Sequence, residues 1–88
     1  MKPIVVLAVN ARWVHTAFGA RSLIANLGSL RDRAVLVERT ISERAVDIAE
    51  AVLDQDPALV GIGIYVWNAE VCAEVVAMLK ALRPDVPV

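Results

Sequence analysis

The sequence predicts a three-layer α/β sandwich built on a parallel sheet, and two patterns indicate this fold class. The segments Ile4–Val9 and Leu59–Val66 are continuous apolar runs rich in β-branched residues, as is typical of strands buried on both faces. The segments that follow them repeat apolar residues every three or four positions, which favours amphipathic helices. Because strands and helices alternate along the chain, we expect parallel strands covered by helices on both faces.

The first half of the chain predicts a strand, a helix, a second strand and the start of a second helix. Ala17–Leu30 places its apolar residues on one helical face, namely Ala20, Leu23, Ile24, Leu27 and Leu30. Ala34–Val37 predicts a short second strand. Ser42 is a favourable helix cap, and it precedes a second apolar stripe formed by Ala45, Ile48, Ala49, Val52 and Leu53.

The second half repeats this pattern. The third strand, Leu59–Val66, contains Gly61 and Gly63, and Asn68 is expected to cap a third helix. The apolar stripe of that helix is Val71, Cys72, Val75, Met78, Leu79 and Leu82. Residues 84–88 predict the start of a fourth strand. We therefore expect a flavodoxin-like (Rossmann-type) sandwich with strand order 2-1-3, truncated at a fourth strand that lies beside the third.

Composition excludes several classes of protein. The 88 residues can form one domain, the net charge is -1, and no basic block occurs, so we expect no nucleic-acid partner. The apolar runs are shorter than the roughly 18 residues of a membrane span, so we expect no membrane partner. One cysteine allows no internal disulfide, and the cytoplasm is the expected location.

The aromatic residues gather where a ligand is expected to bind. Ligands of open parallel α/β sheets bind beyond the carboxyl ends of the strands, where the strand order reverses. Here the loops at that point are Asn10–Gly19 and Tyr65–Asn68. All four aromatic residues and the one histidine lie in or beside these loops: Trp13, Phe18, Tyr65, Trp67 and His15. Large rings at loop tips favour a flat ligand or a partner surface.

Other interpretations of these loops remain open, while several nucleotide sites are excluded. Phe18 and one tryptophan could instead plug the top of the sheet. Arg12 could pair with a carboxylate or phosphate of a ligand, or it could be a solvated loop residue. The chain contains neither the glycine-rich dinucleotide motif nor the phosphate-binding loop of nucleoside triphosphatases.

Three segments carry a resemblance to a known family. They are residues 10–19 (NARWVHTAFG), 38–44 (ERTISER) and 60–68 (VGIGIYVWN). Along nearly its whole length the chain resembles the N-terminal cobalamin-binding domain of cobalamin-dependent radical S-adenosylmethionine enzymes. The resemblance implies that residues 1–88 are the front part of such a domain and are not catalytic alone. It also implies a parent enzyme, methyltransferase or cyclase-like, whose missing radical domain would hold an iron–sulfur cluster and S-adenosylmethionine.

The familiar cobalamin motif is Asp-x-His-x-x-Gly, in which the imidazole ligates cobalt and the carboxylate orients it, whereas the resemblance to the radical group implies a cobalt face without histidine. Here Trp13 stands at the position of that aspartate, and one additional residue separates His15 from Gly19. A lone histidine without Cys, Asp or Glu at ligand spacing is also a weak metal signal. We therefore assign no metal ligand in this chain and expect cobalt to carry no histidine from it.

The resemblance and the strand order together define a predicted cofactor site. Cobalamin is expected to lie across the carboxyl ends of strands one and three. The residues expected to bind it are Asn10, Arg12, Trp13, His15, Thr16, Gly19, Tyr65, Val66, Trp67 and Asn68. A second hypothesis, from a different class, is a non-catalytic flavodoxin-like module whose aromatic loops dock on a protein partner.

Self-association is expected as well. The hydrophobic fraction is 58%, which is high for so short a chain. A truncated sheet would leave one edge of the third strand unpaired, and unpaired edges readily pair with another chain. We expect a homodimer or larger assembly through that edge, with Val75, Val76 and Leu79 left partly bare.

Overall fold

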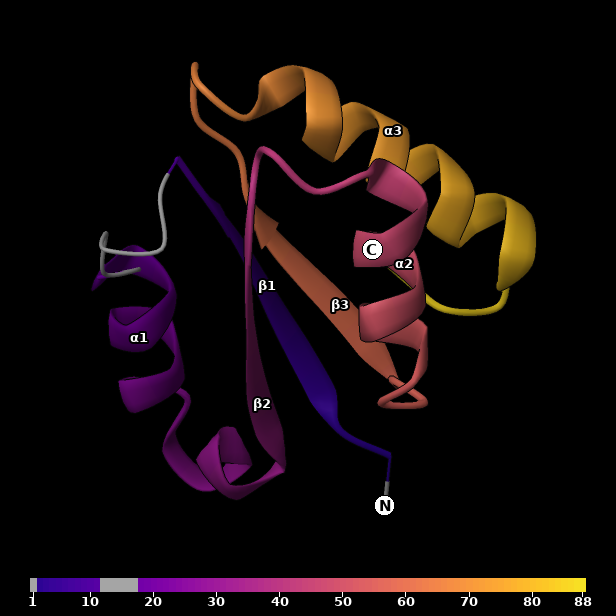
Figure 1. Ribbon diagram of the computed structural model, residues 1–88. Coiled ribbons are helices and arrows are strands. Elements are labelled where there is room, and N and C mark those ends of the chain that lie inside the picture. Colours follow the sequence, from indigo (N-terminus) through magenta and orange to yellow (C-terminus); the bar gives the residue numbers. More distant parts are fainter. Residues whose placement is uncertain (1, 12–17) are drawn as a thin grey trace.

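The computed structural model describes residues 2–11 and 18–88, which form an α/β unit around a three-stranded parallel sheet (Figure 1). The strands are β1 (Ile4–Asn10), β2 (Ala34–Thr40) and β3 (Leu59–Gly63), in the order β2-β1-β3. Ile4 of the central strand pairs with Ala34 on one side and Leu59 on the other. The predicted fold class and the predicted order of the first three strands are therefore confirmed.

The helices divide between the two faces of the sheet. Helix α1 (Phe18–Ala25) lies on one side, and α2 (Ala45–Leu53) and α3 (Ala69–Leu82) lie on the other (Figure 1). The strand order explains this arrangement, because the chain moves outward from β1 to β2 and then crosses back to β3. Right-handed connections place the helices of opposite steps on opposite faces.

The hydrophobic core lies between the sheet and the pair of helices α2 and α3. Alternate residues of β1 (Val5, Leu7 and Val9) point into it and are at most 2% exposed. The helical stripes supply the opposing side chains Ile48, Ala49, Val52, Cys72, Val75 and Leu79, all buried. Burial also raises the pKa of the Cys72 thiol above its ordinary value, because the thiolate loses its hydration.

Two predicted helix features are wrong. The helix expected over Ala17–Leu30 ends at Ala25, and a 3₁₀ helix follows at Gly28–Arg33. Gly28 redirects the chain there with a φ of 62°, which glycine adopts readily. Ser42 does not cap α2, whose N-cap is Arg44; its hydroxyl instead lies 2.7 Å from the Thr40 hydroxyl.

The strand bounds also differ from those predicted. Strand β2 runs to Thr40 and not to Val37, because its last residues pair with the end of β1. Strand β3 ends at Gly63 and not at Val66, and the large apolar side chains that follow are exposed. Leu82, expected in the stripe of α3, is 59% exposed.

The segment after α3 lies where a fourth strand was expected. The backbone N–H of Val60 in β3 donates to the carbonyl of Pro87 at 2.9 Å, and Val86 is buried in the main core. Val75 and Leu79, expected to be partly bare, are 0% and 2% exposed because α2 and Val86 help to enclose them. Self-association through the outer edge of β3 stays a prediction, which sedimentation at micromolar concentration would test.

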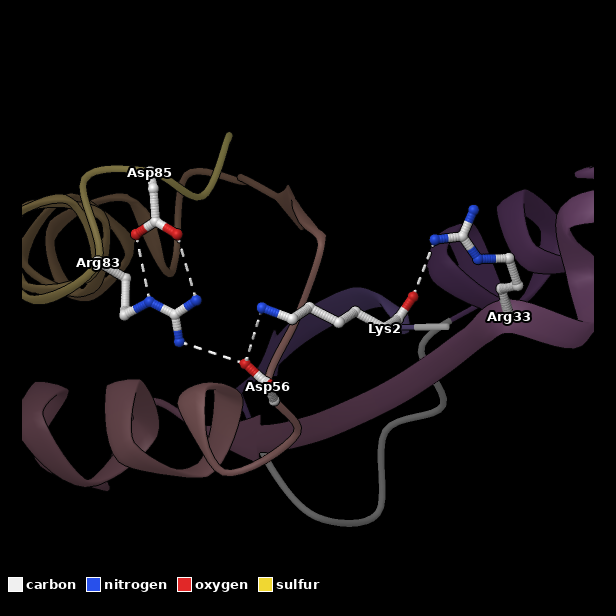
Figure 2. A network of polar contacts seen from close by, with 5 residues as sticks. All are labelled: Lys2, Arg33, Asp56, Arg83 and Asp85. Carbon is white, nitrogen blue, oxygen red and sulfur yellow. Dashed lines mark hydrogen bonds and ion pairs between the residues drawn. The ribbon is translucent and has the colours of Figure 1, made fainter.

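Charged side chains join four segments near the start of the sheet (Figure 2). Asp56, in the turn between α2 and β3, lies 3.5 Å from the ammonium of Lys2 and 3.3 Å from the guanidinium of Arg83. Arg83 also pairs with Asp85 at 3.2 Å, and Arg33 donates to the carbonyl of Lys2. These contacts lie at the opposite end of β3 from the predicted ligand site.

Within residues 2–11 and 18–88, no helix is long and apolar enough to cross a membrane.

Candidate ligand-binding cleft

After Leu59, strand β3 places no large side chain on the face of the sheet beside α1. Val60 and Ile62 point toward the main core, so Gly61 and Gly63 lie on the opposite face. Their partners on β1 are Val6 and Ala8. Apart from its two chain neighbours, no atom of the described residues lies within 4 Å of a Cβ added to Gly61. The sheet surface there is therefore open backbone, at the place where a larger residue would fill the space.

This open surface forms the floor of a cleft of about 630 Å³. One wall is α1, which contributes Gly19, Ala20 and Leu23, and the carboxyl end is bounded by Tyr65 and Trp67. The remaining lining comes from the sheet and from the residue after β1: Val6, Leu7, Ala8, Val9, Asn10, Ala11, Gly61, Ile62 and Gly63. No charged side chain lines the cleft within the described residues, so it suits a largely apolar ligand group.

The two aromatic rings of the cleft stack on each other. The centroids of Tyr65 and Trp67 lie 4.6 Å apart and the ring planes are inclined by 1°. The residues are 47% and 56% exposed, so both keep accessible surface. The Tyr65 hydroxyl approaches α1 so closely that a Cβ added to Gly19 would lie 2.8 Å from it. Glycine at position 19 therefore allows the ring to reach the wall formed by α1.

The structure places the predicted cofactor residues in different surroundings. Asn10, Gly19, Tyr65 and Trp67 line the cleft together. Val66 is 96% exposed and does not line it. Asn68 is buried beneath the aromatic loop, at 1% exposure. The other predicted residues, Arg12, Trp13, His15 and Thr16, lie outside the described residues.

Sequence reasoning missed the floor and the helical wall of the cleft. Val6, Ala8, Ala20, Leu23 and Gly61 all line it, and none of them was predicted to bind a ligand. A usable signal was present, because Gly61 and Gly63 are two residues apart in an otherwise apolar strand. Alternate strand residues share one face, so both glycines remove bulk from the same surface.

The described residues of the cleft supply binding groups and no acid–base pair. They offer apolar side chains, ring faces, the Asn10 amide, the Tyr65 hydroxyl and strand backbone. Within residues 2–11 and 18–88, no group of three or more His, Cys, Asp or Glu side chains could hold a metal ion. This arrangement is suited to holding a flat molecule.

No protein family model, curated protein or solved structure matches this chain.

Proposed function

We propose that this chain is the cobalamin-binding module of a cobalamin-dependent radical S-adenosylmethionine enzyme, methyltransferase or cyclase-like, and that it binds the cofactor without catalysing the reaction alone. The observation that carries the proposal is the open cleft over Gly61 and Gly63, bounded by the stacked rings of Tyr65 and Trp67. It lies at the carboxyl ends of β1 and β3, where strand order reverses and ligands of such sheets bind. The resemblance of residues 10–19, 38–44 and 60–68 to such domains names the cofactor.

The described residues fit a cofactor that combines a flat ring with an appended group. The exposed faces of Tyr65 and Trp67 offer apolar contact to a ring. Among the described residues outside its two chain neighbours, no atom lies within 4 Å of a Cβ placed on Gly61, and Val6, Ala8 and Leu23 line the cleft with apolar side chains. A whole corrin is larger than this cleft, so Val6, Ala8 and Leu23 would hold only the appended part, while the exposed faces of Tyr65 and Trp67 would contact the ring.

The residues of the cleft indicate which tasks the cofactor would perform and which the chain would perform. Cobalamin, when bound, would supply cobalt-centred group transfer. The chain would orient the cofactor through Tyr65 and Trp67 and exclude water from one side of it through Val6, Ala8 and Leu23. We assign no proton transfer to the described residues of the cleft, among which no acid–base pair occurs.

Filling the floor of the cleft tests the proposal. The 88-residue chain is titrated with hydroxocobalamin, and binding is followed by visible absorption and equilibrium dialysis. We expect saturable binding with a shifted absorption band. The Gly61→Leu variant places a side chain in the open space and should bind at least roughly tenfold more weakly, a loss of about 1.4 kcal/mol.

The matched control is Ala77→Leu, which adds the same side chain at an exposed position of α3, on the other face of the sheet. Its cobalamin affinity should equal that of the unaltered chain. Absence of saturable binding by the unaltered chain, or equal binding by Gly61→Leu, would contradict the proposal.

A second candidate function is a non-catalytic protein-interaction module. The exposed loop after β3 favours it, because Ile64 and Val66 are 58% and 96% exposed and contiguous exposed apolar surface marks interaction sites. The hydroxocobalamin titration separates the two candidates, since an interaction module would give no saturable change in the cobalamin spectrum.

A further inference from the structure

The buried amide of Asn68 joins the ends of two strands to the aromatic loop. Its Nδ2 donates to the carbonyl of Val9 at 3.0 Å and to the carbonyl of Gly63 at 3.1 Å. Its Oδ1 accepts a hydrogen bond from the backbone N–H of Tyr65 at 2.7 Å. Both amide hydrogens and the amide oxygen thus have partners, on β1, on β3 and on the loop.

These bonds differ from those of an ordinary helix cap. Asn68 is the N-cap residue of α3, yet its side chain makes no capping bond. Its backbone carbonyl accepts from the N–H of Cys72 at 2.9 Å and so begins the helix. The side chain is consequently free to bond to the two strand ends at Val9 and Gly63. The last backbone pair between β1 and β3 is Ala8 with Gly63. The amide therefore continues the link between these two strands past their final backbone pair.

The same bonds fix the position of the aromatic loop. Tyr65 donates its N–H to the Asn68 side chain, and its carbonyl accepts from the Asn68 N–H at 3.2 Å. The backbone of Tyr65 is thus held from both sides. Its ring can then rest against Gly19 and stack on Trp67. A wall held in this way loses its conformational freedom during folding, so ligand binding carries a smaller entropic cost.

We infer that Asn68 is a positioning residue that builds the aromatic wall of the cleft before any ligand arrives. The inference rests on the proposed function only for the identity of the ligand, because the state of the wall can be measured without one. Asn68 itself, buried at 1% exposure, acts through Tyr65 and Trp67.

The test compares Asn68→Ala with Val75→Ala, both in a Trp13→Phe background so that fluorescence reports Trp67 alone. Val75 is fully buried in the core below α3, so its truncation lowers stability without removing a bond to the loop. In the folded state of Asn68→Ala we expect loss of the near-ultraviolet circular dichroism of the stacked rings and stronger acrylamide quenching of Trp67. Val75→Ala should keep both signals at their original values up to its lower unfolding temperature.

Cobalamin affinity provides a separate readout. Relative to the Trp13→Phe background, Asn68→Ala should bind hydroxocobalamin roughly tenfold more weakly, a loss of about 1.4 kcal/mol, while Val75→Ala should bind as tightly as that background when folded. If the unaltered chain does not bind cobalamin but Asn68→Ala still releases Trp67, the proposed function fails and the positioning role stands. If Asn68→Ala keeps the dichroism and quenching of its background, the positioning role is wrong.

A measurement on the unaltered chain covers the case in which Asn68→Ala does not fold. Tyr65 lies outside every helix and strand, yet its amide hydrogen should exchange slowly because it bonds to a buried side chain. The amides of Val66 and Trp67, for which the described part of the chain provides no acceptor, should exchange faster. Equal exchange at all three positions would overturn the inference.

Discussion

On the face covered by α2 and α3, β1 presents Val5, Leu7 and Val9, whereas on the face beside α1 the same strand contributes Val6 and Ala8 to the cleft. The contrast is stronger along β3, where Val60 belongs to the core and Gly61 leaves open space. Two helices cover the first face, and one eight-residue helix lies beside the second. Along β3, side chains that alternate in size thus fill the face covered by α2 and α3 and leave open space on the face beside α1.

The largest expected effect lies on the filled face. Leu7 is fully buried at the centre of the sheet, so Leu7→Ala should lower the free energy of unfolding by about 2–5 kcal/mol, since buried leucines leave cavities when truncated. Urea denaturation measures this change. A loss below about 1 kcal/mol would show that the two faces do not differ as described.

On the open face, the next largest effect should appear in binding. Trp67→Ala removes the stacking of Trp67 on Tyr65, and an aromatic pair contributes about 0.5–1.5 kcal/mol to stability. The loss of stability should be no larger than this, because Trp67 is more than half exposed and buries little apolar surface. Cobalamin affinity should fall further, by about tenfold or more. Calorimetry and the hydroxocobalamin titration measure the two losses. Losses of equal size would assign Trp67 the role of a plug over the sheet.

A smaller effect of opposite sign is expected at Gly61. Glycine inside a strand costs roughly 0.5–1 kcal/mol relative to alanine, and an added Cβ at this position meets no atom within 4 Å. Gly61→Ala should therefore raise the free energy of unfolding by up to that amount. Denaturation in urea decides the sign, and a clear decrease would mean that the floor of the cleft is more closely packed than it is in this structure.

The smallest effect should come from the charged contacts remote from both faces. Hydrogen bonding to Arg83 is the main reason that the pKa of Asp85 lies below its ordinary value of 3.8. A depressed carboxyl pKa stabilises the folded chain above the unfolded-state value and loses that effect as the pH falls through the folded-state value. Arg83→Met should thus abolish a small component of stability at neutral pH, and the difference from the unaltered chain should shrink as the pH falls through the folded-state pKa of Asp85.

Thermal unfolding from pH 7 to pH 2 tests this prediction. These groups are exposed, so salt should reduce the difference at neutral pH. A difference between the two proteins that grows as the pH falls would have the wrong sign.

The strands and the filled core could be predicted from the sequence, because β-branched runs and helical stripes depend on neighbouring residues. The end of β3 could not be predicted, because Ile64 and Val66 continue the apolar pattern of the strand. In the structure the Asn68 side chain donates a hydrogen bond to the carbonyl of Gly63, the last residue of β3. The early end of α1 also escaped prediction, because Gly28 could have been tolerated within a helix. The aromatic boundary of the cleft followed from loop positions. The floor of the cleft could not be predicted, because the sequence does not show that α1 leaves open the face of the sheet that Gly61 and Gly63 share.

The buried thiol of Cys72 allows the opening of the folded chain to be followed by the rate at which a thiol reagent modifies it. The thiolate is the reactive form of cysteine, and here the side chain is fully buried with a raised pKa. A thiol reagent should therefore modify only those molecules in which α3 has lifted from the sheet, and the sequence contains no second cysteine to confuse the count. Cys72 lies one helical turn beyond Asn68. A ligand that binds the cleft of the folded chain, and not the unfolded chain, should slow labelling that requires unfolding by the factor by which it favours the folded state.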